Sequence, residues 1–104
     1  MGSYKVELTI AAKKDLRDIY FYISNNLKAP ATADKLLDKM EAKLLTLKRN
    51  PFLYAVERNE QLKRRNLHKL IVDNYLIFYI VNEKTSTVYI VRVLYARRDC
   101  VNLL

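Results

Sequence analysis

The sequence predicts a single α+β domain over residues 1–104, in which an antiparallel sheet packs on a helical hairpin in the order β-α-α-β-β-β. Three observations lead to this fold class. The N-terminal residues alternate apolar and polar, the next two stretches repeat apolar residues at helical spacing, and three short apolar stretches separated by turn residues follow. A chain of 104 residues is too short to form two domains with adequate cores.

The first half of the chain is expected to hold one strand and two long helices. A strand is expected at Tyr4–Ile10, and the apolar period becomes helical from Ala11, with Thr9 as the N-cap. The second helix is expected to begin at Pro30, which a first turn tolerates, and to end at Asn50–Pro51. The apolar stripes are Ala12, Leu16, Ile19, Tyr20, Ile23 and Leu27, and then Ala33, Leu36, Leu37, Met40, Leu44 and Leu47. Together they predict an antiparallel hairpin that lies on an apolar surface.

The second half is expected to hold the other strands, after an irregular stretch over residues 52–61. The strands are expected at Leu67–Val72, Tyr75–Val81 and Val88–Tyr95. Asp73–Asn74 is expected to form a tight turn between the first pair, and residues 82–87 a second turn. Short turns of this kind predict a meander, which the N-terminal strand is expected to join.

The middle strand of this meander is apolar on both faces. One face carries Tyr75, Ile77, Tyr79 and Val81, and the other carries Leu76, Phe78 and Ile80. The helical hairpin can cover only one face, and an open antiparallel sheet normally has a polar second face. Three explanations stay open: the second face is covered by a partner segment, by the C-terminal residues Val101, Leu103 and Leu104, or by burial of a central strand within the domain.

The charge of the chain indicates the kind of partner. It has 19 Lys+Arg against 11 Asp+Glu, a formal net charge of +8 and a pI near 9.7. This surplus favours a nucleic acid, a ribosome or an acidic protein as partner over a role in solubility alone. No apolar run reaches the roughly 20 residues that span a bilayer, and the N-terminus has no signal-peptide core. With a lone Cys100, we expect a cytoplasmic protein that does not act at a membrane.

Several classes of site are excluded by residues that the sequence lacks. The only glycine is Gly2, so a glycine-rich phosphate loop or dinucleotide fingerprint is excluded. One Cys and one His cannot supply the common kinds of zinc site. We therefore expect no cofactor and no metal.

Two strands resemble those of the RelE/ParE toxin superfamily. Tyr75-Leu76-Ile77-Phe78-Tyr79 resembles its aromatic strand and Ile90–Asp99 its terminal strand, and the element order is similar over the whole length. Asp15-Leu16 and Asn50-Pro51 also look similar. The resemblance implies the growth-arresting toxin of a bacterial type II toxin–antitoxin (plasmid-stabilisation) module, neutralised by a cognate acidic antitoxin. RelE-like members cut messenger RNA in the ribosomal A site, whereas ParE-like members inhibit DNA gyrase.

RNA cleavage without a metal would need a base for the 2′-hydroxyl, cations for the phosphate and an acid for the leaving oxygen. The candidate catalytic residues are His68, Lys69, Arg97 and Tyr95, with Lys63, Arg64, Arg65 and Arg98 as phosphate-binding cations. Several of these residues have an ordinary explanation as well. His68 can be a packed residue, the cations at 63–65 a solvated loop, and Asp99 a partner for one of the neighbouring arginines. Arg92 is expected to form a structural ion pair with Glu41 or Asp38.

One departure favours the ParE-like branch. RelE-type nucleases carry an arginine directly after the tyrosine of the middle strand, where Leu76 stands here. Losing such a cation costs on the order of 3 kcal/mol of transition-state stabilisation. A ribosome-dependent nuclease stays the alternative, and a chain that has lost its toxicity and now serves as a binding partner is the third hypothesis.

Overall fold

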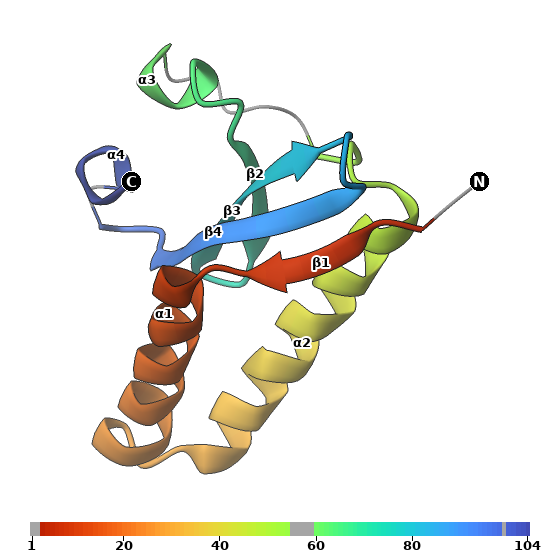
Figure 1. Cartoon of the computed structure of the whole chain (residues 1–104). Helices are drawn as coiled ribbons and strands as arrows, with labels where there is room; N and C mark the ends of the chain where they lie inside the picture. The colour runs from red at the N-terminus through yellow and green to blue at the C-terminus, as the bar shows by residue number, and fades with distance from the viewer. Residues whose placement is uncertain (1–2, 55–59, 99) are drawn as a thin grey trace.

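The computed structural model describes residues 3–54, 60–98 and 100–104, apart from the side chains of residues 61, 62 and 101 (Figure 1). The elements, in chain order, are β1 (Lys5–Leu8), α1 (Ile10–Phe21), the π-helical turn η1 (Tyr22–Asn26), α2 (Pro30–Arg49), α3 (Glu60–Lys63), β2 (His68–Val72), β3 (Tyr75–Asn82), β4 (Thr87–Tyr95) and α4 (Cys100–Leu103). The predicted β-α-α-β-β-β order is confirmed. The short helices α3 and α4 were not predicted, because four residues are too few to show a helical period.

The ends of the two long helices follow from local chemistry. The Thr9 hydroxyl accepts a hydrogen bond from the Ala12 amide at 3.1 Å, which confirms Thr9 as the N-cap of α1. Pro30 occupies the first turn of α2, as predicted. At the other end of α1 the helix widens into η1, where the Leu27 amide donates to the Tyr22 carbonyl at 3.0 Å. Lys28 then takes a positive φ of 52°, and the chain reverses into α2.

The four-stranded sheet has the order β1-β4-β3-β2. The meander β2-β3-β4 is antiparallel as predicted, and Asp73, at the tight turn, has a φ of 52°. One detail differs from the expectation: β1 pairs with β4 in parallel, so the sheet is mixed rather than wholly antiparallel. A tight turn forces neighbouring strands to be antiparallel, but β1 is joined to the meander only through the hairpin and α3, which impose no such direction.

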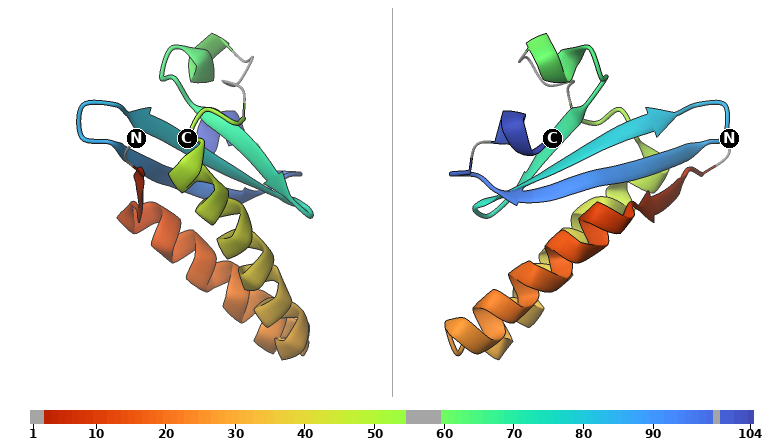
Figure 2. Two further views of the ribbon diagram at one scale, coloured as in Figure 1. Left: turned by 90° about the vertical axis from the view of Figure 1, so that its right-hand side faces the viewer. Right: turned by 60° about the vertical axis from the view of Figure 1, so that its left-hand side comes forward.

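The α1–α2 hairpin covers one face of the sheet, as the two views of Figure 2 show. The core between them is formed by buried residues from both layers, chiefly Ala12, Ile23, Ala33, Leu36, Met40, Leu47, Leu70, Val72, Ile77, Tyr79, Val88, Ile90 and Val93. The predicted stripes supply all six of the helical members in this list. No helix within the described ranges is long and apolar enough to cross a membrane.

The opposite face of the sheet carries a second, smaller core. Leu67, Phe78 and Leu94 are buried there, and Leu103 and Leu104 pack against them together with Cys100. The C-terminal segment therefore covers part of the second apolar face, which was one of the three explanations left open by the sequence. The contribution of the Val101 side chain lies outside the described residues.

Candidate binding groove

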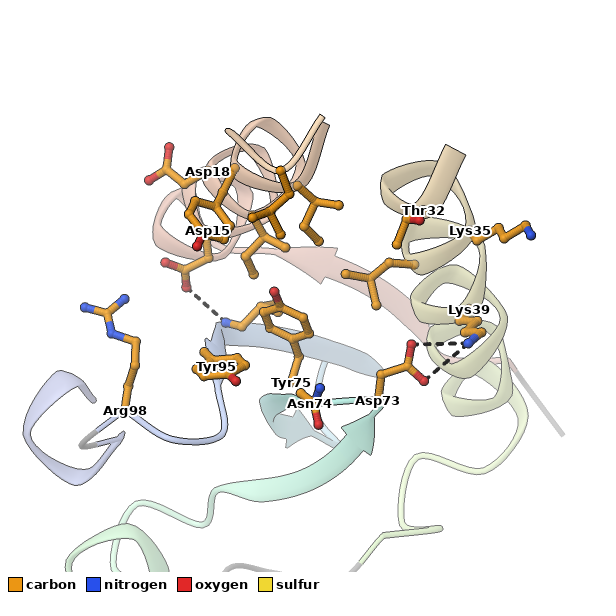
Figure 3. Close-up of a pocket in the computed structure, with 16 residues that line it drawn as sticks. Asp15, Asp18, Thr32, Lys35, Lys39, Asp73, Asn74, Tyr75, Tyr95 and Arg98 are labelled. Atoms are coloured by element: carbon orange, nitrogen blue, oxygen red, sulfur yellow. Dashed lines mark hydrogen bonds and ion pairs between the residues drawn. The ribbon is translucent and has the colours of Figure 1, made fainter. Parts of the chain in front are cut away.

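A groove opens between the far end of the helical hairpin and the end of the sheet (Figure 3). It arises because the hairpin runs on past the sheet and diverges from it, as Figure 2 shows. Its volume is about 820 Å³. The main apolar lining comes from Ile19, Ile23, Leu36, Tyr75, Val93 and Tyr95. One wall thus belongs to the helices, and the other to the β2–β3 turn and the end of β4.

Two ion pairs join the walls of the groove. On one side the Asp15 carboxylate of α1 accepts two hydrogen bonds from Arg92 of β4, from Nε at 2.7 Å and from Nη2 at 2.9 Å. On the other side Lys39 Nζ of α2 lies 3.2 Å from a carboxylate oxygen of Asp73 in the β2–β3 turn. The first pair is largely buried and the second is exposed. The buried, two-point pair therefore contributes more to the position of its wall.

The partner of Arg92 differs from the one expected. The ion pair itself is present, but it forms with Asp15 and not with Glu41 or Asp38. The reason is that Thr9 holds the start of α1 against β4, through a bond from its amide to the Ile90 carbonyl at 3.0 Å. The Asp15 hydrogen bond also raises the pKa of the Arg92 guanidinium above its ordinary value.

Two tyrosines form the sheet side of the groove. Tyr75 and Tyr95 are cross-strand partners on β3 and β4, and their rings meet edge to face with centroids 5.6 Å apart. Burial raises the pKa of the Tyr75 phenol, and the neighbouring Tyr95 and Tyr22 add to the rise. Together with Tyr22 at the hairpin end, these rings give the groove an aromatic lining with polar tips.

The unpaired charges at the groove are positive. Asp15 and Asp73 are neutralised by the two ion pairs, and Asp18 lies within 3.6 Å of Lys14. The side chains of Lys35 and Arg98 also line the groove, and neither makes a hydrogen bond or ion pair with the residues that the structure describes. Figure 3 shows these two residues on opposite sides of the groove, with the Lys35 ammonium directed outward from α2. An apolar groove with a free cation on each side suits an acidic, amphipathic ligand.

Of the predicted catalytic residues, His68 is built into the core. It is 8% exposed, and its ring stacks on Tyr79 with centroids 4.9 Å apart and 14° between the planes. Phe52 packs against the same imidazole, edge to face at 6.1 Å. Nδ1 lies 2.7 Å from the carbonyl oxygen of Tyr54, and because a carbonyl only accepts, Nδ1 must carry a proton. These contacts favour packing over proton transfer, and the catalytic role of His68 stays a prediction.

The other predicted residues are divided between the two faces of the sheet. Tyr95 and Arg98 line the groove on the hairpin face. Lys69 is the cross-strand partner of Phe78, whose side chain belongs to the opposite core, so Lys69 points to the α4 side. Arg65 also lies on that side, where its guanidinium donates to the carbonyl of Leu104. Lys69 and Tyr95 therefore lie on different faces of the sheet, and their catalytic roles stay predictions.

The remaining cations lie in exposed connections. Lys63 and Arg64 are exposed at the end of α3, and Arg97 is exposed in the turn between β4 and α4. The suggested pairing of an arginine with Asp99 falls on a residue outside the described part of the chain. Within the described ranges, no group of His, Cys, Asp or Glu side chains could hold a metal ion.

Residues 6–100 match the family model described as "ParE toxin of type II toxin-antitoxin system, parDE". The chain belongs to this toxin family. It is therefore the toxin component of a type II toxin–antitoxin module, as the resemblance implied. Comparison with curated proteins gives no match.

Solved structures similar to the toxin have the same fold. The chromosomal ParDE system of P. aeruginosa matches with a TM-score of 0.72 and 16% identity, covering 91% of this chain and 98% of that one. A mutant of the E. coli toxin RelE in the free state matches with a TM-score of 0.68 and 16% identity, covering 97% and 92%. The RelBE2 complex of Mycobacterium tuberculosis matches with a TM-score of 0.63 and 22% identity, covering 91% and 93%.

The toxin's groove was not predicted, although one signal for it was present. Asp15 lies three residues after Ala12 and four before Ile19, so helical spacing puts this carboxylate on the apolar side of α1. A buried acid of this kind requires a cation, and the mid-strand Arg92 was the natural candidate. Lys35, Lys39 and Asp73 gave no such signal, because they are polar residues at ordinary exposed positions.

Proposed function

We propose that this toxin arrests growth by binding a protein target in the cytoplasm, with DNA gyrase as the target, and that it does not itself cut RNA. The observation that carries the proposal is the division of the candidate catalytic residues between two faces of the sheet. Lys69 and Arg65 lie on the α4 side, whereas Tyr95 and Arg98 lie at the groove. General acid–base catalysis needs its groups within about 3 Å of the same reacting atoms.

The surface beside Leu76 also argues against a phosphate site. Leu76 packs against the small core of Phe78 and Leu94 on the α4 face, at the position where RelE-like nucleases carry an arginine. Leu103 and Leu104 cover the same cluster. An apolar, covered surface offers no stabilisation to the charge that develops on a phosphate during cleavage.

The groove provides a surface on which an antitoxin segment can dock. Its apolar lining matches the apolar stripe of an amphipathic helix, and Lys35 and Arg98, on opposite sides of the groove, supply cations for the carboxylates of that helix. The net charge of +8 attracts such an acidic segment from a distance. A segment that folds as it binds loses conformational entropy, which the buried apolar contacts and charge pairs offset.

The experiment that tests the mode of action compares two purified systems. The toxin is added to DNA gyrase with relaxed plasmid, and to ribosomes translating a defined transcript. We expect supercoiling to stall and the transcript to stay intact. Cleavage of the transcript at the A site would replace this proposal with the nuclease alternative, and inertness in both systems would leave the chain as a binding partner without toxicity.

A further inference from the structure

The guanidinium of Arg92 is shared between the groove and the C-terminal helix. Nε and Nη2 donate to the two carboxylate oxygens of Asp15, which lines the groove. Nη1 donates in the other direction, to the Leu103 carbonyl of α4 at 2.8 Å. One side chain thus contacts both the hairpin wall on one face of the sheet and the segment that covers the other face.

The geometry of the group makes these contacts interdependent. A guanidinium is planar and rigid, so two bonds to one carboxylate fix its plane and the direction of its remaining N–H groups. Asp15 is itself held in place, because it accepts the Val93 amide at 3.0 Å, and Figure 3 shows this contact at the groove wall. Asp15 therefore determines where Nη1 points, and with it whether the Leu103 carbonyl has a donor.

The Arg92 bond is one of the contacts that hold α4 in place. The helix has four residues, fewer than an isolated helix needs for stability in water. The contacts that position it include the apolar contacts of Cys100, Leu103 and Leu104 with the small core, the contact of Cys100 Sγ with the Tyr95 carbonyl, and two arginine bonds to carbonyls. These two bonds come from Arg92 to Leu103 and from Arg65 to Leu104. Losing one of them should be detectable as faster opening of the segment.

We infer that Asp15 is a positioning residue that couples the groove to α4 through Arg92. A partner that covers Asp15 excludes water from the ion pair and so strengthens it, and the better-positioned Arg92 then holds α4 more firmly. A partner that draws the Asp15 carboxylate away from Arg92 has the opposite effect and loosens α4. By linkage, a partner that holds α4 in its present position also favours binding at the groove. Only the identity of the molecule that binds the groove rests on the proposed function, in which it is the antitoxin.

The second ion pair of the groove supplies a matched control. Lys39 and Asp73 also join a helix of the hairpin to the sheet, but no hydrogen bond links either of them to α4 among the described residues. Replacing Asp73 therefore removes an ion pair from the groove without touching the connection to α4. General loosening of the hairpin would affect both variants, whereas coupling through Arg92 affects only one.

The test is hydrogen–deuterium exchange on the full, free chain, comparing wild type with Asp15→Asn and Asp73→Asn. We expect the amides of α4, and the Leu104 amide that donates to the Cys100 carbonyl, to exchange roughly tenfold faster in Asp15→Asn only. The inference is overturned if α4 exchanges at the wild-type rate in Asp15→Asn, or equally fast in both variants.

A second variant keeps the test decisive if Asp15→Asn fails to fold. Arg92→Lys retains a cation beside Asp15 but has no second nitrogen that can reach the Leu103 carbonyl. The amides of α4 should therefore again exchange faster, while those of β3 stay protected. Unchanged α4 exchange in a folded Arg92→Lys chain would contradict the coupling. Because no antitoxin or gyrase is present, these results do not depend on the proposed function.

Discussion

Asp15 and Arg92 lie 77 positions apart in the sequence and form a two-point ion pair, with side chains 12% and 23% exposed. The pair lies just beyond the residues of β4 that pair with β1, where the Asp15 carboxylate accepts the Val93 amide and the Thr9 hydroxyl donates to the Val91 carbonyl. Beyond the end of β1, side chains from the start of α1 therefore bond to the backbone of β4 along this edge of the sheet. The Asp15–Arg92 ion pair therefore joins the helical hairpin to the edge of the sheet, at the wall of the groove.

Breaking this pair should destabilise the toxin. Arg92→Ala leaves a largely buried carboxylate without its cation and is expected to lower the free energy of unfolding by roughly 3 kcal/mol. Urea denaturation followed by circular dichroism measures the change. Lys39→Ala, which breaks the exposed pair with Asp73, is the control and should cost less than about 1 kcal/mol. Equal losses in the two variants would contradict the importance assigned to Asp15 and Arg92.

Stability should fall at high pH because of Tyr79. Burial raises the pKa of this phenol to about 12 from its ordinary value of 10.0, and the Tyr54 backbone opposes part of the rise. Because the folded pKa is the higher one, the contribution is fully present below pH 10 and is lost as pH rises toward 12. The loss is on the order of 2 kcal/mol.

The measurement is the free energy of unfolding of wild type and Tyr79→Phe between pH 8 and 12. Lysines and other tyrosines also titrate in this range, so the difference between the two proteins isolates Tyr79. That difference should change steadily above pH 10. A difference that stays constant over the whole range would show that burial does not perturb this phenol.

Charge reversal at the groove should weaken antitoxin binding. In Lys35→Glu/Arg98→Glu, carboxylates of the antitoxin meet like charges, and we expect at least about a tenfold rise in Kd together with a smaller dependence on salt. The control is Lys48→Glu, on an exposed position of α2 away from the groove. Calorimetry with the cognate antitoxin gives both quantities. Equal weakening by Lys48→Glu would place the antitoxin elsewhere.

His68 should matter for stability more than for activity. His68→Ala removes a ring that packs on Tyr79 and Phe52, so the free energy of unfolding should fall by about 2 kcal/mol. Growth inhibition by the molecules that remain folded should persist. A well-folded His68→Ala toxin without activity would restore this histidine as a candidate base.

The parts of the fold that depend on local chemistry were predicted from the sequence. Thr9 as a cap, Pro30 as a helix start and Asp73 as a turn residue each act through neighbours within a few positions. The direction of β1 and the partner of Arg92 were not predictable in this way. Both are decided by how α1 lies against β4, a contact between segments far apart in the sequence.

The groove and the candidate site were also predictable only in part, because they combine local features with contacts between distant segments. Tyr95 and Arg98 were singled out from the sequence and do lie at one site, but as part of a groove whose other wall is helical. Strand alternation could have separated His68 from Lys69, because neighbours on a strand point to opposite faces. The groove itself depends on the angle between the hairpin and the sheet, and the local sequence pattern does not predict this angle.

The most direct test of the central claim is the activity of a triple variant, Lys69→Gln/Tyr95→Phe/Arg97→Gln. It removes the candidate catalytic groups other than His68, while each replacement keeps most of the packing volume. The account predicts a folded protein that still stalls gyrase supercoiling and still arrests growth. The account is contradicted if the wild-type toxin cleaves the transcript at the A site and the triple variant does not.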